Sequence, residues 1–274
     1  MATVAQKLWL KERHPDILSG TPRAHAIDRW IFVFTAVWFI LIVLTGFVPD
    51  SIGLLGAVKS GAHPPLPIVL HMHAIAMGSF LLLVLTQSIL MATGRREQHK
   101  KLGIAAFVLV PLLVAIGCVL APTIYHLVWN LAQSGPPDLR PQFHKRVLAL
   151  ENILLLQIRI GILFPLLMII ALKNRGANVG LHKRMIFLAT AVPLPAAIDR
   201  MTWLPNTLPA SPVGTDLWIL AALSPLFMWD IVRNRRVHEA YWIWLAMYLP
   251  VALLVYRLWD TPWWHSTART IMAV

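Results

Sequence analysis

Seven long apolar stretches, separated by short connections rich in basic residues or proline, constrain this chain more than any other feature. A helix needs about 20 apolar residues to cross the hydrocarbon core of a bilayer. The predicted spans are residues 30–49, 68–92, 102–121, 148–172, 185–204, 217–232 and 241–258. Strands of a membrane barrel would be shorter and would alternate in polarity, which these stretches do not do. We therefore predict an all-α, polytopic integral membrane bundle of about seven transmembrane helices.

Composition and charge support the same class of protein. The 274 residues are 58% hydrophobic and only 13% charged, whereas soluble domains carry roughly 25% charged residues. The net charge of +12 comes from Lys and Arg, many of which lie in the short connections. That distribution favours contact with anionic lipid headgroups and argues against nucleic acid as a partner. The single cysteine, Cys118, offers neither a disulfide framework nor a thiolate metal site.

The basic residues also predict an orientation. Lys and Arg cluster at 95–101, 173–184 and 233–236, and these connections alternate with less basic ones. Because cytoplasmic loops are enriched in Lys and Arg, we expect a cytoplasmic N-terminus and an external C-terminus in a bacterial inner membrane. The expected organisation is a cytoplasmic N-terminal segment, 1–29, followed by one transmembrane domain, 30–274. Its main soluble piece is an external loop at 122–147.

Two connections lead into the next helix in the same way, with a basic cluster, a histidine, two more basic residues and then an apolar run. Histidines from two helices can ligate a haem iron, and nearby cations can pair with its propionates. This pattern predicts a haem b site with His99 and His182 as axial ligands and Lys100 and Arg184 as propionate partners. A quinone or a cytoplasmic reductant would then be the redox partner. The alternative is that both histidines are interfacial residues that contact headgroups or cap helices.

A second group of polar residues is predicted in the outer half of the bundle. Arg159 lies more than two turns inside an apolar span, where a charge needs a partner or a function. Its candidate partners are Glu151 and Asp199. These residues either tie two spans together or form the anion-binding site of a transporter or enzyme. That outer site would comprise His73, Glu151, Arg159, Asp199 and Arg200. Pro193 and Pro195 predict a break in the fifth span beside it.

One motif resembles a known bacterial membrane family. The pattern is His73…Gln87…Arg96…His99-x-x-x-Gly103, followed by His182-x-Arg184-Met185 and Arg200. It is similar to the family known as domain of unknown function 2306 and covers about residues 68–205. Lys100 and Lys183 stand where that family's pattern has Arg. The resemblance implies a multi-pass membrane protein and adds Gln87, Gly103 and Met185 to the residues of interest, but it brings no established chemistry.

A fainter resemblance is to the ascorbate-reducing class of transmembrane di-haem b-type cytochromes, in which histidines on four consecutive helices ligate two haems. Here His99 and His182 resemble the inner pair of ligands. The fourth span has no histidine within its membrane section to pair with His73, so the resemblance implies one haem. The sequence thus leaves three classes: a redox protein, a transporter or enzyme, and a scaffold or accessory subunit whose polar residues only lock helices together. No HxxxH, HExxH or CxxC spacing predicts a metal site.

Overall fold

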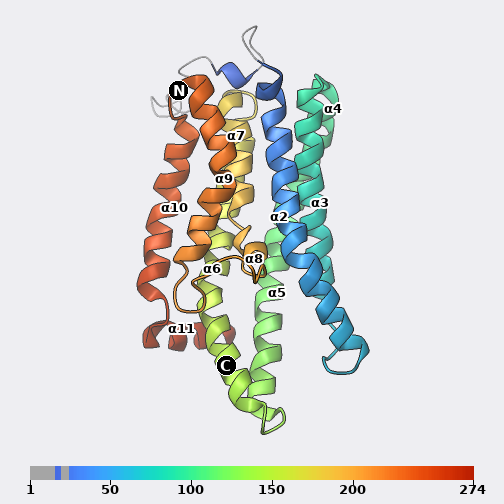
Figure 1. Cartoon of the computed structure of the whole chain (residues 1–274), viewed down its shortest axis with the longest axis vertical. Helices are drawn as coiled ribbons and strands as arrows, with labels where there is room; N and C mark the ends of the chain where they lie inside the picture. The colour runs from blue at the N-terminus through green and yellow to red at the C-terminus, as the bar shows by residue number, and fades with distance from the viewer. Residues whose placement is uncertain (1–15, 20–24) are drawn as a thin grey trace, which may run out of the picture.

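The computed structural model describes residues 16–19 and 25–274, and every regular element in that part of the chain is a helix (Figure 1). Six helical segments there are long and apolar enough to cross a membrane, which confirms the predicted multi-pass helical class. The long helices are α2 (Ala26–Lys59), α3 (Ile68–Ala92), α5 (Ala106–Ser134), α6 (Arg140–Lys173), α9 (Val213–Asn234) and α10 (Glu239–Leu258). The shorter ones are η1 (Ile17–Ser19), α4 (Arg96–Leu102), η2 (Gly103–Ala105), α7 (Val179–Ala191), α8 (Pro195–Ile198) and α11 (Pro262–Met272).

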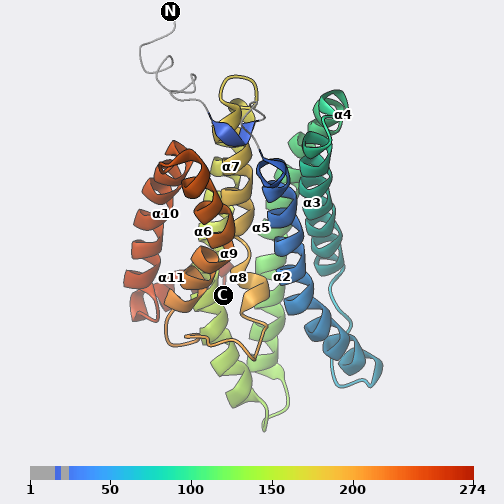
Figure 2. The same cartoon turned by 45° about the horizontal axis from the view of Figure 1, so that its top comes forward.

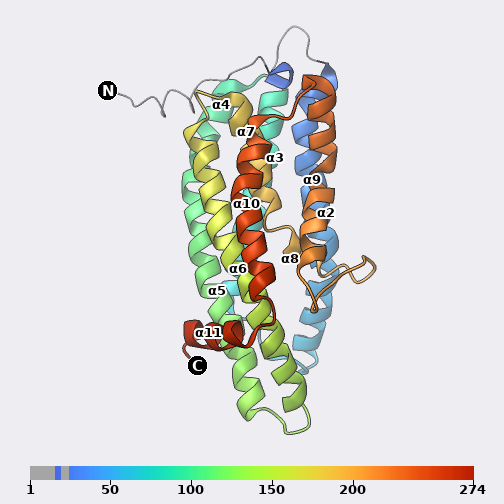
Figure 3. The same cartoon turned by 90° about the vertical axis from the view of Figure 1, so that its left-hand side faces the viewer.

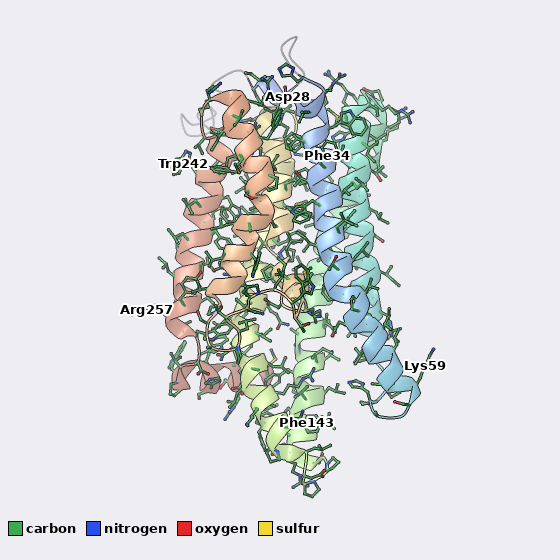
Figure 4. All side chains as sticks on the ribbon, viewed as in Figure 1. Asp28, Phe34, Lys59, Phe143, Trp242 and Arg257 are labelled. Carbon is green, nitrogen blue, oxygen red and sulfur yellow. The ribbon has the colours of Figure 1, made fainter. Side chains whose placement is uncertain are left out.

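The long helices run side by side, and consecutive ones alternate in direction except α6 and α9, which both end at the same end of the bundle (Figures 1 and 2). The connections 93–95, 174–178 and 235–238 gather at one end, which we call the basic end. The connections 60–67 and 135–139 lie at the other end together with α11, and we call this the distal end. Figure 4 places Asp28 at the basic end, and Lys59 and Phe143 towards the distal end.

Helix α7 lies at the centre of the bundle and contributes much of its core. Leu181, Met185 and Leu188 on this helix are almost completely buried. Aromatic pairs pack around it, including Phe39 of α2 against Phe187 of α7 at 6.1 Å between ring centroids. Polar residues of α7 are therefore inside the protein and need partners there.

The expected fifth span is interrupted where two prolines predicted a break. Helix α7 ends at Ala191, and the short helix α8 begins at Pro195. Pro193 has no backbone N–H, and its ring would clash with the carbonyl of Ala189 in a continuous helix. With 13 residues, α7 alone is shorter than a full membrane crossing, so it is absent from the six long apolar helices.

The segment 122–147 was expected to be an external loop, and this expectation is corrected by the structure. Helix α5 continues to Ser134 and α6 begins at Arg140, so only residues 135–139 connect them. At 1.5 Å per residue, α6 is about 51 Å long and exceeds the roughly 30 Å of hydrocarbon. Tyr125, Val128 and Val147 explain the extension, because they join a second hydrophobic core with α11.

The two ends of the chain also differ from the expected organisation. Of the predicted cytoplasmic segment 1–29, residues 1–15 and 20–24 lie outside the described residues, and α2 begins already at Ala26. Beyond the last span, the sequence analysis did not predict α11. Asp260 adopts a left-handed conformation (φ 56°), and Thr261 accepts a hydrogen bond from the backbone N–H of Trp264 at 3.2 Å. This turn directs α11 across the end of the bundle (Figure 3).

A close approach of α2 to α8 generates a prediction. A Cβ atom on Gly46 would come within 2.1 Å of the carbonyl oxygen of Ala197. Gly46→Ala should therefore lower the thermal stability of the purified protein, since overpacking costs about 1–3 kcal/mol. Gly53→Ala is the matched control, because it lies on the same helix and its Cβ would meet nothing within 4 Å. Equal melting temperatures for the two variants would contradict the observed helix contact.

Candidate functional site

His99 and His182 lie together at the basic end, close enough to interact electrostatically. Nδ1 of His182 is 2.8 Å from the carbonyl oxygen of Ala171, and Nδ1 of His99 is 3.4 Å from that of Gln87. The second distance is long for a hydrogen bond, so His99 is held less firmly. Because a carbonyl only accepts, each Nδ1 donates the hydrogen bond, so in the neutral ring Nε2 is the unprotonated nitrogen.

The side chain of Gln87 lies beside this histidine pair, and its amide group forms no hydrogen bond with the described residues. Its amide oxygen and nitrogen are both buried and have no hydrogen-bond partner among the described residues. A Cβ on Gly103 would come within 3.5 Å of the amide nitrogen, so the glycine lies directly against it. Buried polar groups are almost always paired with protein, water or ligand. The unpaired amide therefore marks a place where a polar ligand can bind.

Arg184 is not available as a propionate partner beside the histidine pair, although the sequence predicted that role. Residues 182 and 184 are two apart on α7, so their side chains point about 200° away from each other. All five N–H donors of Arg184 are used by Asp16, Asp230 and the carbonyl oxygen of Gly180, at distances from 2.5 to 3.0 Å. No donor is left for a propionate.

Two other cations are candidates for meeting an anionic group beside the histidines. Lys100 pairs with Glu97 at 2.9 Å on the exposed surface of α4. Arg175, which the sequence analysis did not assign, is near enough to His182 to interact with it electrostatically. Its guanidinium carbon is 5.0 Å from the ring centroid of Phe107. Arg175 is therefore better placed than Arg184 to meet an anionic group beside His182.

Arg184 instead organises a buried network with Asp16, Lys183, Asp230 and Asn234. Lys183 contacts Asp16 at 2.7 Å, and the Asn234 amide donates to Asp230 at 2.6 Å. Burial alone would raise the pKa of Asp16, but hydrogen bonds and charge from Arg184 and Lys183 hold that pKa well below its usual range. The network ties the segment before α2 to α7 and α9.

His238 borders this network and caps α10. Its Nδ1 accepts a hydrogen bond from the backbone N–H of Ala240 at 3.1 Å. Burial and then the charge of Arg184 lower the pKa of His238 to about 3. The imidazole is therefore neutral at physiological pH, as an accepting cap requires.

Of the five residues predicted for the outer site, Asp199 lies within electrostatic range of both Arg159 and Arg200, whereas Glu151 makes its contacts elsewhere. Glu151 is fully buried and anchors α11, because it accepts hydrogen bonds from Tyr125 at 3.0 Å and Arg269 at 2.8 Å and contacts His265 at 2.6 Å. Nδ1 of His73 is buried and has no partner among the described residues.

Arg159 pairs with neither of its predicted partners. Its Nη1 is 2.7 Å from Asp216, an acidic residue in the first turn of α9. The hydroxyl groups of Tyr248, at 2.6 Å, and Tyr256 also donate to Asp216. The sequence analysis did not single out Asp216, although an acidic residue entering an apolar helix is a signal that could have found it.

The remaining outer residues lie nearer the surface. Arg200 pairs with Asp50 at 3.0 Å, where both side chains are exposed, and Asp199 accepts a hydrogen bond from Asn206 at 3.4 Å. Met185 is completely buried in the core one turn beyond His182. The structure thus gathers the motif residues Gln87, His99, Gly103 and His182, and leaves Arg200 and Met185 elsewhere.

Comparisons of the chain with protein-family models, with curated proteins and with solved structures find no match. Within residues 16–19 and 25–274, no group of three or more His, Cys, Asp or Glu is arranged to hold a metal ion. Function must therefore be inferred from the geometry of the histidine pair and of the buried polar groups.

The depressed pKa of His238 predicts acid sensitivity. In the unfolded chain His238 takes up a proton near its ordinary pKa of 6.5, whereas in the folded protein it does so only near 3. Stability should therefore fall as the pH drops from 7 to 4, because the unfolded state binds the additional proton. His238→Asn keeps an accepting cap and should lose less thermal stability over this range. Melting temperatures at both pH values measure the effect, and the exposed His144→Asn is the control. If His238→Asn lost as much thermal stability between pH 7 and pH 4 as the wild type, the prediction would be contradicted.

Proposed function

We propose that this protein is a b-type cytochrome of the bacterial inner membrane, with His99 and His182 as axial ligands of one haem. The observation that carries the proposal is that Nδ1 of each ring faces a backbone carbonyl. This contact orients the ring, fixes its tautomer and leaves Nε2 available. Histidines that ligate metals are usually supported in this way.

The number of ligands favours haem over a free metal ion. The site offers two imidazole nitrogens, and the described residues supply no group of three metal-binding side chains. A porphyrin provides four nitrogen ligands of its own, so its iron needs only two axial ligands from the protein. The unpaired amide of Gln87 beside the pair fits a partly polar group.

Each residue has a defined part in this proposal. The carbonyl groups of Ala171 and Gln87 hold the two rings, and Arg175 and Lys100 offer positive charge to the propionates. The haem would supply one-electron redox chemistry. Electrons would come from a cytoplasmic reductant at the basic end and pass to a quinone in the bilayer.

The alternative classes have less support. A transporter or enzyme with an anionic site in the outer half needs uncompensated positive charge, but Arg159 pairs with Asp216 and Arg200 pairs with Asp50. A scaffold would account for the ion pairs of Arg184 and Glu151. It offers no reason for the buried, unpaired amide of Gln87.

An absorption spectrum tests the haem proposal. Protein purified from haem-supplied cells should show a Soret band and sharp α and β bands after reduction with dithionite. Even supporting residues of metal ligands contribute about 10–100-fold to metal affinity. His99→Ala and His182→Ala should therefore each remove most of the Soret absorbance, and added imidazole should restore part of it. His71→Ala, an exposed histidine of α3, should keep the full band. A folded but colourless wild-type protein would rule the proposal out.

We also propose that the chain crosses the membrane seven times, with α7 and α8 as one broken crossing. Helices α6 and α9 both end at the basic end (Figure 1). The chain between them must therefore travel towards the distal end, and only α7, α8 and residues 199–212 are available. The arginines of the basic end favour the cytoplasmic side, which gives a cytoplasmic N-terminus and an external C-terminus.

Reporter fusions test this topology. Alkaline phosphatase fused after Val274 of the full chain should be active, and green fluorescent protein at the same position should be dark. Phosphatase inserted at Gly176, in a basic connection, should be inactive. The opposite pattern at the two positions would reverse the orientation, and activity at both would contradict seven crossings.

A further inference from the structure

Two buried hydrogen-bond donors without acceptors lie against the same aromatic ring in the bundle. Arg159 of α6 is 1% exposed, and its Nε has no partner among the described residues. Trp244 of α10 is 5% exposed, and its indole nitrogen likewise has none there. The guanidinium carbon of Arg159 is 5.0 Å from the ring centroid of Tyr248, and the ring of Trp244 stacks on Tyr248 at 4.5 Å.

These donors indicate an absent acceptor. Inside a bilayer there is no bulk water to satisfy a polar group, so an unpaired N–H is costly. Here two such groups, from different helices, both lie against the ring of Tyr248. Residues 244 and 248 are four apart on α10 and therefore share a face. The missing partner is thus an acceptor between α6 and α10.

Charge balance decides the kind of acceptor. Arg159 is already neutralised by Asp216, which also accepts from the hydroxyl groups of Tyr248 and Tyr256. Asp199 is a second carboxyl group within electrostatic range of Arg159, and Arg200 also acts on it, so the two arginines and two carboxylates already balance. An added anion would leave excess negative charge in a low-dielectric region, which is strongly unfavourable. The ligand is therefore neutral, in contrast to the anion predicted for Arg159 from the sequence.

We propose that this place binds the neutral head group of a lipid-soluble quinone. A quinone is flat and carries carbonyl oxygens that only accept hydrogen bonds. The Nε–H of Arg159 and the indole N–H of Trp244 can each donate to such an oxygen, and the face of the Trp244 ring that is turned away from Tyr248 can contact the head group. The proposal does not depend on haem, since His99 and His182 lie at the basic end.

Binding of decylubiquinone to the purified full-length protein in lipid nanodiscs tests the proposal by calorimetric titration. Trp244→Phe keeps an aromatic ring and removes the donor. Because one hydrogen bond contributes modestly to net affinity, this change should weaken binding roughly 2- to 12-fold. Trp242→Phe is the matched control, since Trp242 lies on the same helix, is 60% exposed and points away from the bundle (Figure 4). The Trp242→Phe variant should bind decylubiquinone with the affinity of the wild type.

A second variant separates the loss of a hydrogen-bond donor from a general loss of folding. Arg159→Lys keeps a positive charge opposite Asp216 but lacks the Nε–H, and it should also weaken binding. The proposal is overturned if the wild type shows no saturable binding, or if both folded variants bind as tightly as the wild type. It is also overturned if decanoate, an anion of similar chain length, binds more tightly than the quinone. Loss of haem in His99→Ala should leave quinone affinity unchanged.

Discussion

All five N–H donors of Arg184 are satisfied inside the protein, by Asp16, Asp230 and the carbonyl of Gly180. The central helix α7 is short and broken after Ala191, so it depends on side-chain contacts for its position. Removing one partner of a buried ion pair leaves an uncompensated charge, which is strongly destabilising. Because residues 182 and 184 point in nearly opposite directions, anchoring Arg184 towards α9 turns His182 towards α6. The ion network therefore sets the geometry of the histidine pair.

Buried polar groups of this protein fall into two kinds. Arg184 and Glu151 have their charges fully compensated, and these contacts join α7 to α9 and α11 to α5 and α6. The amide of Gln87, Nε of Arg159 and the indole nitrogen of Trp244 have no partner among the described residues. Satisfied groups stabilise a fold, whereas unsatisfied ones inside a bilayer are costly and mark places for ligands.

The unpaired groups of Gln87, Arg159 and Trp244 lie at two separate levels along α6. Ala171, which holds His182, and Arg159 are 12 residues apart on this helix, or about 18 Å along its axis. The first level contains the histidine pair, for which we propose an iron porphyrin. The second level has neutralised charge and two unpaired donors, for which we propose a quinone. A haem near the basic end and a quinone deeper in the bundle would together form a membrane redox protein.

Hydropathy and proline positions determined most of the architecture from sequence alone: the long apolar helices, the break at Pro193 and Pro195, and the placement of His99 and His182 at one end. These features follow from local free energies of each segment in lipid, so spacing and composition suffice to predict them. The extension of α5 and α6, the turn into α11 and the choice of Asp216 as the partner of Arg159 were not predicted. They depend on how helices rotate and pack against one another, and a charge within a span can face several partners at similar depth. Only the tertiary structure decides which carboxylate it meets and which polar groups are left for a ligand.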